Sequence, residues 1–165
     1  MIRTLTIAAL ALVAMAVVPA QASDLGGAKA FATWLYGHYP KSGVGTDFHS
    51  LGPEAARIFH PGLLQLIKQD DEAGDDLAPD LAGDPICDCQ DNNGLEFTVT
   101  SVTASEFGRA TAKVVRRDMG DPDGEVITLD LAQTNQGWRV YDVETRDMPS
   151  LRAFLIQSAQ EWNGR

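Results

Sequence analysis

Apolar residues recur at helical spacing in the segment that follows residue 22. They are separated by three or four positions, as is typical of the buried face of an α-helix. The residues of this stripe are Leu25, Ala28, Ala32, Leu35 and Tyr39. Ser23 or Asp24 is suited to cap the helix, which is expected to end before Pro40.

Helical signals continue in two further segments. Pro53 is expected to start a short helical turn that runs through Phe59, and Pro61 suits the first turn of another helix. The residues expected on the buried side of that helix are Leu63, Leu64, Leu66 and Ile67.

The period changes from helical to alternating after Gly94. Leu95, Phe97 and Val99 alternate with polar residues, and further β-branched segments follow at 109–117, 125–135 and 137–143. Residues 121–124 (Asp-Pro-Asp-Gly) and 135–137 (Asn-Gln-Gly) have the composition of turns. The pattern therefore predicts a four-stranded antiparallel meander.

A last helix is predicted after Ser150, which is suited to cap it. One face of this helix contains Leu151, Phe154, Leu155, Ser158 and Trp162. N-terminal helices packed on one side of a curved four-stranded meander, with a C-terminal helix, form an α+β fold. Residues 23–165 are predicted to form a single domain, because they contain no internal repeat and no sign of a second domain.

The first 22 residues have the pattern of a secretory signal peptide. Arg3 precedes an apolar run over residues 5–18, and small residues stand at Ala20 and Ala22. A helix of that length rises ~21 Å, less than the ~30 Å hydrocarbon core, which disfavours an uncleaved anchor. We expect cleavage after Ala22 and export by a bacterium to the periplasm or the medium, where thiols tend to oxidise.

Charge narrows the classes of partner. The chain has 13 basic and 23 acidic residues, a net charge of −10, which argues against binding to nucleic acid. Nine of the acids and no base lie between Asp70 and Asp91. This stretch is interpreted as a solvated linker, and the alternatives are weak Ca²⁺ coordination or attraction of a basic protein to Asp75, Asp76 and Asp80.

The acidic stretch contains a short motif at residues 84–91 (Asp-Pro-Ile-Cys-Asp-Cys-Gln-Asp). Its Asp84, Pro85, Gln90 and Asp91 resemble the Asp-Pro…Gln-Asp loop of domain-of-unknown-function family 3828, which contains small exported bacterial proteins. Shorter matches are residues 60–63 (His-Pro-Gly-Leu), 138–143 (Trp-Arg-Val-Tyr-Asp-Val) and 150–152 (Ser-Leu-Arg). The resemblance implies a fold similar to the nuclear transport factor 2-like cone, and it implies no catalytic set or cofactor.

Two cysteines distinguish this loop. Cys87 and Cys89 are separated by one residue, so a disulfide between them requires a turn at Asp88. A local disulfide is the leading interpretation. Thiol exchange and a soft-metal site are the alternatives, and a metal would draw its ligands from Cys87, Cys89, Asp84, Asp88 and Asp91.

Two carboxylates of the predicted sheet are the candidates for acid–base chemistry. Asp130 and Asp142 alternate with apolar residues, while Arg116, Arg117 and Arg139 lie on neighbouring strands. A carboxylate that points into an apolar pocket has a raised pKa and can act as a general base. The favoured interpretation is an outward-facing ion pair across the strands.

These patterns favour an exported binding or protein-interaction module without catalytic activity or cofactor. Its partner is expected to be a basic protein surface or a small ligand, and the chain is compatible with a homodimer. The alternatives are an isomerase or hydratase that uses Asp142 or Asp130, and a thiol or soft-metal role for Cys87 and Cys89.

Overall fold

The structure is a computed structural model that describes residues 24–39, 52–73, 81, 83–89, 94–118 and 121–163. Several predicted features lie outside the described residues: the signal peptide with its cleavage site, Gln90, and the acids Asp75, Asp76, Asp80 and Asp91. None of the helices in these described segments has the length and apolar character needed to cross a membrane.

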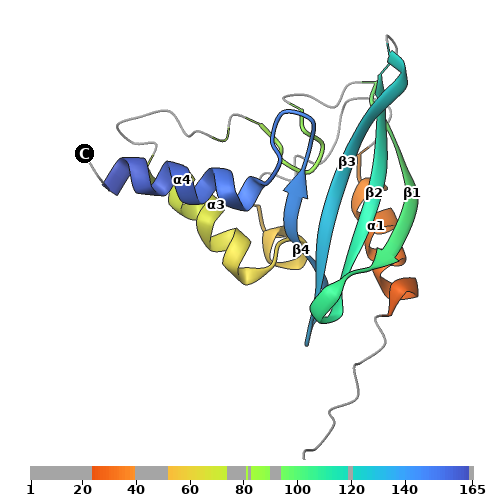
Figure 1. Cartoon of the computed structure of the whole chain (residues 1–165), viewed down its shortest axis with the longest axis horizontal. Helices are drawn as coiled ribbons and strands as arrows, with labels where there is room; N and C mark the ends of the chain where they lie inside the picture. Colours follow the sequence, from red (N-terminus) through yellow and green to blue (C-terminus); the bar gives the residue numbers. More distant parts are fainter. Residues whose placement is uncertain are drawn as a thin grey trace, which may run out of the picture.

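The described chain folds into helices around an antiparallel sheet (Figure 1). The elements are α1 (Leu25–Tyr36), α2 (Ala55–Ile58), α3 (Pro61–Ala73), β1 (Glu96–Ala104), β2 (Arg109–Asp118), β3 (Asp121–Thr134), β4 (Gly137–Glu144) and α4 (Leu151–Asn163). The strand order is β1-β2-β3-β4, and each neighbouring pair is antiparallel. The predicted α+β meander is confirmed, whereas the resemblance to family 3828 and its cone stays a prediction.

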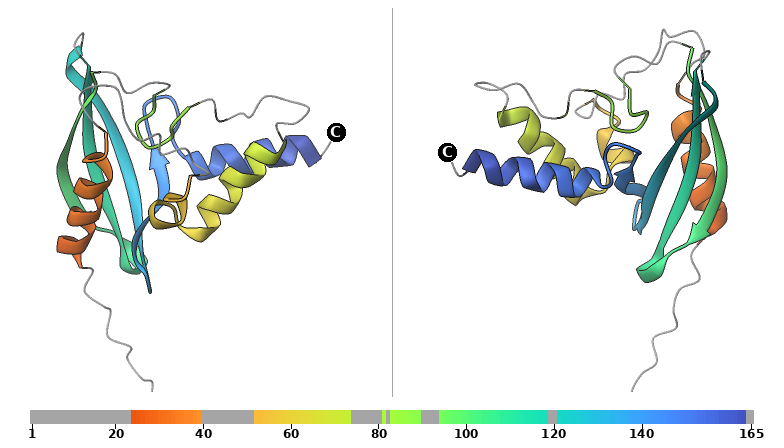
Figure 2. Two further views of the ribbon diagram at one scale, coloured as in Figure 1. Left: turned by 180° about the vertical axis from the view of Figure 1, so that it is seen from behind. Right: turned by 45° about the horizontal axis from the view of Figure 1, so that its top comes forward.

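Helix α1 covers one face of the sheet, and α3 and α4 pack against each other beside β4 (Figures 1 and 2). Asp24 caps α1, because its Oδ1 accepts a hydrogen bond of 2.9 Å from the Gly27 amide. The predicted stripe is confirmed: Ala28, Ala32 and Leu35 are fully buried. The helix ends at Tyr36, and buried Tyr39 belongs to the turn that follows it.

The predicted turn at residues 121–124 is wrong. Strand β3 already begins at Asp121, which pairs with Asp118, so the chain reverses between these two residues. Gly124 instead lies beside an irregularity of the strand pairing and has a φ of +70°. A β-bulge and a turn both favour glycine at positive φ, so the Asp-Pro-Asp-Gly sequence is compatible with either of them.

A bulge in β4 decides which side chains leave the core. Asp130 pairs with Asp142 and Leu131 pairs with Val140, so Tyr141 is the extra residue of β4. Val140 and Val143 are both fully buried, and Tyr141 and Asp142 between them are only partly buried. The simple alternation that groups Tyr141 with Val143 is therefore broken at this point.

Candidate functional site

The cysteine motif forms a tight loop, here called the disulfide loop (residues 84–89). Cys87 and Cys89 lie at disulfide-bonding distance, with their Cα atoms 5.2 Å apart. Asp88 adopts a φ of +52°, which provides the turn that this spacing requires. The backbone amide of Asp84 donates a hydrogen bond of 2.9 Å to the Cys89 carbonyl and closes the loop.

Side chains of α1 and its following turn fix the disulfide loop to the core. The Tyr36 hydroxyl donates a hydrogen bond of 2.8 Å to the Ile86 carbonyl, and the Tyr39 hydroxyl donates one of 2.6 Å to Asp84 Oδ2. Burial raises the pKa of Tyr36, and the negative charge of Asp84 raises it further. The Tyr36 hydroxyl is therefore a neutral donor at physiological pH.

Strand β2 holds the other side of the disulfide loop. The Arg116 guanidinium donates to the carbonyl oxygens of Cys87 and Asp88, and it forms an ion pair with Glu125. Cys87 is completely buried, whereas Cys89 is only partly buried. Burial closes the Cys87 sulfur to thiol exchange, and exchange at Cys89 stays a prediction.

The soft-metal alternative gains no support from the described residues. They contain no group of three or more His, Cys, Asp or Glu side chains arranged to hold a metal ion. Asp84 also has other interactions: its Oδ1 accepts a hydrogen bond of 2.8 Å from the Ile86 amide. Asp91 lies outside the described residues, so a metal site that includes it stays a prediction.

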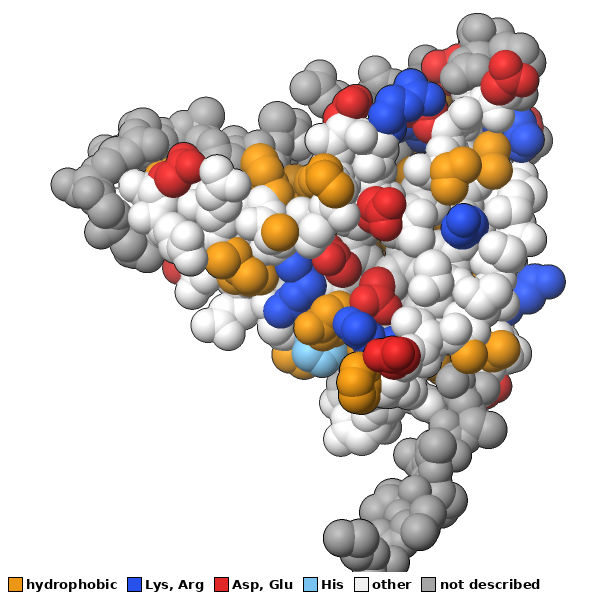
Figure 3. Space-filling model, viewed as in Figure 1, with side chains coloured by type: hydrophobic (Ala, Val, Ile, Leu, Met, Phe, Trp, Pro, Cys, Tyr) orange, Lys and Arg blue, Asp and Glu red, His pale blue; other side chains and the backbone are white. Residues whose placement is uncertain are grey.

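Asp130 and Asp142 line a polar hollow of about 240 Å³ between the sheet and the segment that leads to α4. They are direct cross-strand partners on β3 and β4. The lining of the polar hollow is Ser105, Thr111, Thr128, Asp130, Asp142, Val143, Glu144 and Pro149. Figure 3 shows acidic side chains gathered where the sheet meets the helical part of the molecule.

Asp142 anchors the start of α4. Its Oδ1 accepts hydrogen bonds from the amides of Val143 (2.9 Å) and Arg152 (3.0 Å), and its Oδ2 accepts one of 2.6 Å from the Ser150 hydroxyl. Ser150 in turn caps α4 as predicted, because its Oγ accepts a hydrogen bond of 3.0 Å from the Ala153 amide. The Asp142 carboxylate thus stabilises the N-terminus of α4. It forms neither the predicted cross-strand ion pair nor a base in an apolar pocket.

Asp130 forms an ion pair across the strands, but its partner is Arg109, which was not among the arginines expected beside it, and both side chains are largely buried. Its Oδ2 lies 2.8 Å from Nη1 of Arg109 on the neighbouring strand β2. Burial raises the pKa of Asp130, Arg109 lowers it, and the adjacent charge of Asp142 raises it again. The Oδ1 atom is buried and has no hydrogen-bond partner among the described residues.

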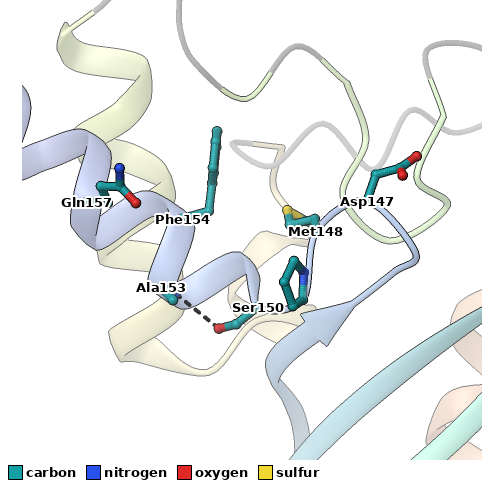
Figure 4. Close-up of a pocket in the computed structure, with 7 residues that line it drawn as sticks. Asp147, Met148, Ser150, Ala153, Phe154 and Gln157 are labelled. Carbon is teal, nitrogen blue, oxygen red and sulfur yellow. Dashed lines mark hydrogen bonds between the residues drawn. The ribbon is translucent and has the colours of Figure 1, made fainter.

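An apolar pocket of about 400 Å³ opens on the other side of the same segment (Figure 4). Its lining is Asp147, Met148, Pro149, Ser150, Ala153, Phe154 and Gln157. Met148 is held by hydrogen bonds with Thr145, from its amide to Thr145 Oγ1 (3.3 Å) and from the Thr145 amide to its carbonyl (2.8 Å). In Figure 4 Phe154 projects from α4 toward the space beside Met148.

Phe154 marks where the predicted apolar face of α4 leaves the core. Leu151 and Leu155 of this face are buried, whereas Phe154 is 37% exposed and lines the apolar pocket. The periodicity of a helix shows which face is apolar, and it does not show where the partner surface ends. The sequence signal that was available is the Pro149-Ser150 pair, which marks the start of α4 beside the pocket.

A second feature that sequence reasoning missed is a cluster around Tyr141. The guanidinium carbons of Arg109 and Arg152 lie 4.7 and 4.4 Å from the centre of its ring. The His60 ring packs edge-on at a centroid distance of 5.3 Å. Burial lowers the pKa of His60, and the positive charge of Arg152 lowers it further. The bulge of β4 explains this cluster, because it turns Tyr141 out of the core.

The fold and these two neighbouring cavities define an α+β protein with a candidate ligand-binding region beside α4. No family model matches the chain, and no curated protein matches it. Its structure is similar to that of a phospholipid-binding protein from Ralstonia solanacearum, solved in complex with a phospholipid. The similarity has a TM-score of 0.40 and 13% identity, and it covers 85% of this chain and 84% of that chain.

Proposed function

We propose that the protein is a binding module that takes up a small molecule with an apolar surface in the apolar pocket. The observation that carries this proposal is the cavity of about 400 Å³ with Phe154, Met148, Pro149 and Ala153 in its wall. Pockets of about 300–1,000 Å³ with apolar walls and few polar groups are typical small-molecule sites. Phe154 is 37% exposed in this wall, so its ring is accessible to a ligand in the pocket.

The enzyme alternative is less well supported by the same geometry. Both oxygens of Asp142 accept hydrogen bonds from residues that start α4 or precede it. An isomerase or hydratase would then depend on Asp130, whose Oδ2 is occupied by Arg109. A binding role requires neither carboxylate to accept a proton.

We infer further that this module is exported. The signal-peptide pattern of residues 1–22 and the disulfide distance between Cys87 and Cys89 both suit an oxidising compartment. The test is the intact mass of protein purified from the periplasm or the medium. A chain that starts at Ser23 and lacks two hydrogens supports the inference, whereas a full-length chain with two free thiols contradicts it.

The binding proposal is tested with decanol as a neutral apolar probe. The exposed 37% of Phe154 is roughly 70 Å² of a ring residue, and covering it stabilises a complex by at most ~1.8 kcal/mol. Phe154→Ala is therefore expected to weaken decanol binding about tenfold, as measured by isothermal titration calorimetry.

The matched control is Ile156→Ala. Ile156 lies on the same helix and is 43% exposed, but it does not line the apolar pocket. This variant should bind decanol as the wild type does. Equal weakening in both variants, or no binding by the wild type, contradicts the proposed function.

A further inference from the structure

The two edges of the sheet differ in how they are covered. At one edge, the carbonyl oxygen of Val140 in β4 accepts a hydrogen bond of 2.8 Å from the His60 amide, and Val140 forms a bridge with Phe59. At the other edge (Figure 1), β1 pairs only with β2 among the described residues. The outward N–H and C=O groups between Phe97 and Ala104 are therefore positioned to pair with another strand.

The side chains of β1 do little to prevent such pairing. Edge strands are commonly protected by a very short length, by lysine or by proline. Strand β1 has nine residues, and Glu96 is the only charged residue among them. Phe97, Val99 and Val102 pack against the core but remain partly exposed. This edge thus has the length and the composition of a strand that continues its sheet.

A bulge in β1 limits which strand fits this edge. The strand pairing shifts between Val99 and Ser101, so Thr100 is the extra residue, and its Oγ1 donates a hydrogen bond of 3.1 Å to the Lys113 carbonyl. Beyond the bulge the alternation is reversed: Val99 and Val102 are both partly buried, although they are three positions apart. A strand without a bulge can match the two faces of β1 on only one side of Thr100.

A second copy of β1 fits both sides of Thr100. When two β1 strands lie antiparallel with the two-fold axis between Val99 and Thr100, the two bulges oppose each other and the residue counts agree. Partly buried side chains then oppose partly buried ones, and exposed side chains oppose exposed ones. The opposed pairs are Phe97 with the partner's Val102, Thr98 with the partner's Ser101, and Glu96 with the partner's Thr103. This register places no like charges opposite each other.

We propose that the protein forms a homodimer in which two β1 strands pair antiparallel in this register and join the two sheets into one. Main-chain hydrogen bonds and the covering of Phe97, Val99 and Val102 stabilise the dimer. The two-fold axis is perpendicular to the sheet, so both copies of α1 lie on the same face of the joined sheet. The dimer goes beyond the proposed function and does not depend on it, because no residue of β1 lines either cavity.

The first test is a charge substitution with a rescue. Sedimentation equilibrium of the purified protein is expected to show a dimer that dissociates on dilution. Thr103→Glu should weaken dimerisation about tenfold, because the two-fold axis places a glutamate opposite Glu96 twice. Adding Glu96→Lys should restore dimerisation, because each new glutamate then faces a lysine. Thr103 is exposed, and circular dichroism checks that the variants keep the fold.

The matched control is Gln133→Glu. It adds the same charge at an exposed residue of β3, away from the proposed interface, and should leave the dimer unchanged. Phe154→Ala should leave the dimer unchanged as well, so the dimer and the proposed function can fail separately. Equal weakening by Thr103→Glu and Gln133→Glu overturns the proposal, because it shows an effect of net charge alone.

The second test is a disulfide between subunits, which fixes the register. Opposed residues of an antiparallel pair have Cα atoms ~4.5–5.5 Å apart, within the reach of a disulfide. A mixture of Thr98→Cys and Ser101→Cys should therefore give a covalent dimer on mild oxidation, seen on a non-reducing gel. Thr98→Cys alone should not, because its two cysteines would lie roughly 10 Å apart along the strands.

The remaining outcomes contradict the dimer. A monomer at every concentration overturns the proposal. A dimer that Thr103→Glu does not weaken, or that Glu96→Lys does not restore, uses another surface and overturns it too. Efficient crosslinking of Thr98→Cys alone, or no crosslinking of the mixture, shows that the β1 strands do not pair in this register.

Discussion

Removal of the Asp142 carboxylate is expected to loosen the start of α4 and with it one wall of the apolar pocket. Asp142→Ala deletes the acceptor of the Arg152 amide and of the Ser150 hydroxyl, at 3.0 and 2.6 Å. A lost cap contributes ~1 kcal/mol, the helix dipole up to ~1 kcal/mol, and a hydrogen bond to a charged group ~1.5–3 kcal/mol. Because these contributions overlap, we expect the free energy of unfolding to fall by about 2–4 kcal/mol.

A graded series separates this anchoring role from a catalytic one. Asp142→Asn keeps an oxygen that accepts from the Val143 and Arg152 amides, but its amide nitrogen cannot accept from the Ser150 hydroxyl. It should therefore lose the charge contribution and that one hydrogen bond, about 1–2 kcal/mol. Urea denaturation measures both losses, and native-state hydrogen exchange should show faster exchange of the first-turn amides of α4 in Asp142→Ala. A loss below about 0.5 kcal/mol in Asp142→Ala, or equal losses in both variants, would refute the reasoning.

Further expectations concern the backbone, a titrating histidine and the disulfide loop. Gly124→Ala should destabilise the protein by more than the ~1–2 kcal/mol that a left-handed backbone costs an alanine, because the new Cβ would lie 2.6 Å from a β2 carbonyl oxygen. Gly108→Ala is the control for the backbone cost alone, because Gly108 has a φ of +71° and its Cβ would meet no atom within 4 Å. Urea denaturation measures both losses. The pKa of His60 is lowered by burial and a neighbouring guanidinium, so the unfolded chain binds the proton first and stability should fall as the pH drops below 6.5. The free energy of unfolding of His60→Gln should fall less between pH 7.5 and 5.5 than that of the wild type. An unchanged pH dependence would contradict the lowered pKa of His60. Replacing Cys87 and Cys89 together by alanine should cost roughly 1.5 kcal/mol in loop entropy alone, and identical thermal melts would show that the disulfide does not stabilise the fold.

Local patterns were sufficient to predict most of the fold. Along β2 the apolar residues Ala110, Ala112 and Val114 alternate with other residues and are fully buried. This alternation is typical of a strand that packs against the core on one face only. The turn at Asp88 was also predictable, because two cysteines one residue apart can form a disulfide only if the chain bends between them. Each of these features depends on neighbouring residues in the sequence.

The two cavities were not predictable, because they depend on residues that are distant in the sequence. The polar hollow brings Ser105, Thr128 and Pro149 together, and no local pattern connects them. Phe154 has the spacing of a core residue, but the surfaces that cover α4 end before they reach it. The bulge in β4 was not predictable from the sequence either, since one extra residue shifts the alternation without a change in composition.

The bulge connects these failures of prediction to the candidate site. Without the extra residue at Tyr141, strict alternation would place Tyr141 and Asp142 on opposite faces of the sheet. With it, both side chains lie on the face that α1 does not cover, so Asp142 reaches Ser150 and the amide of Arg152. That contact sets where α4 begins and therefore where Phe154 projects beside the apolar pocket. A one-residue irregularity in β4 thus helps to position the segment that lies between the two cavities.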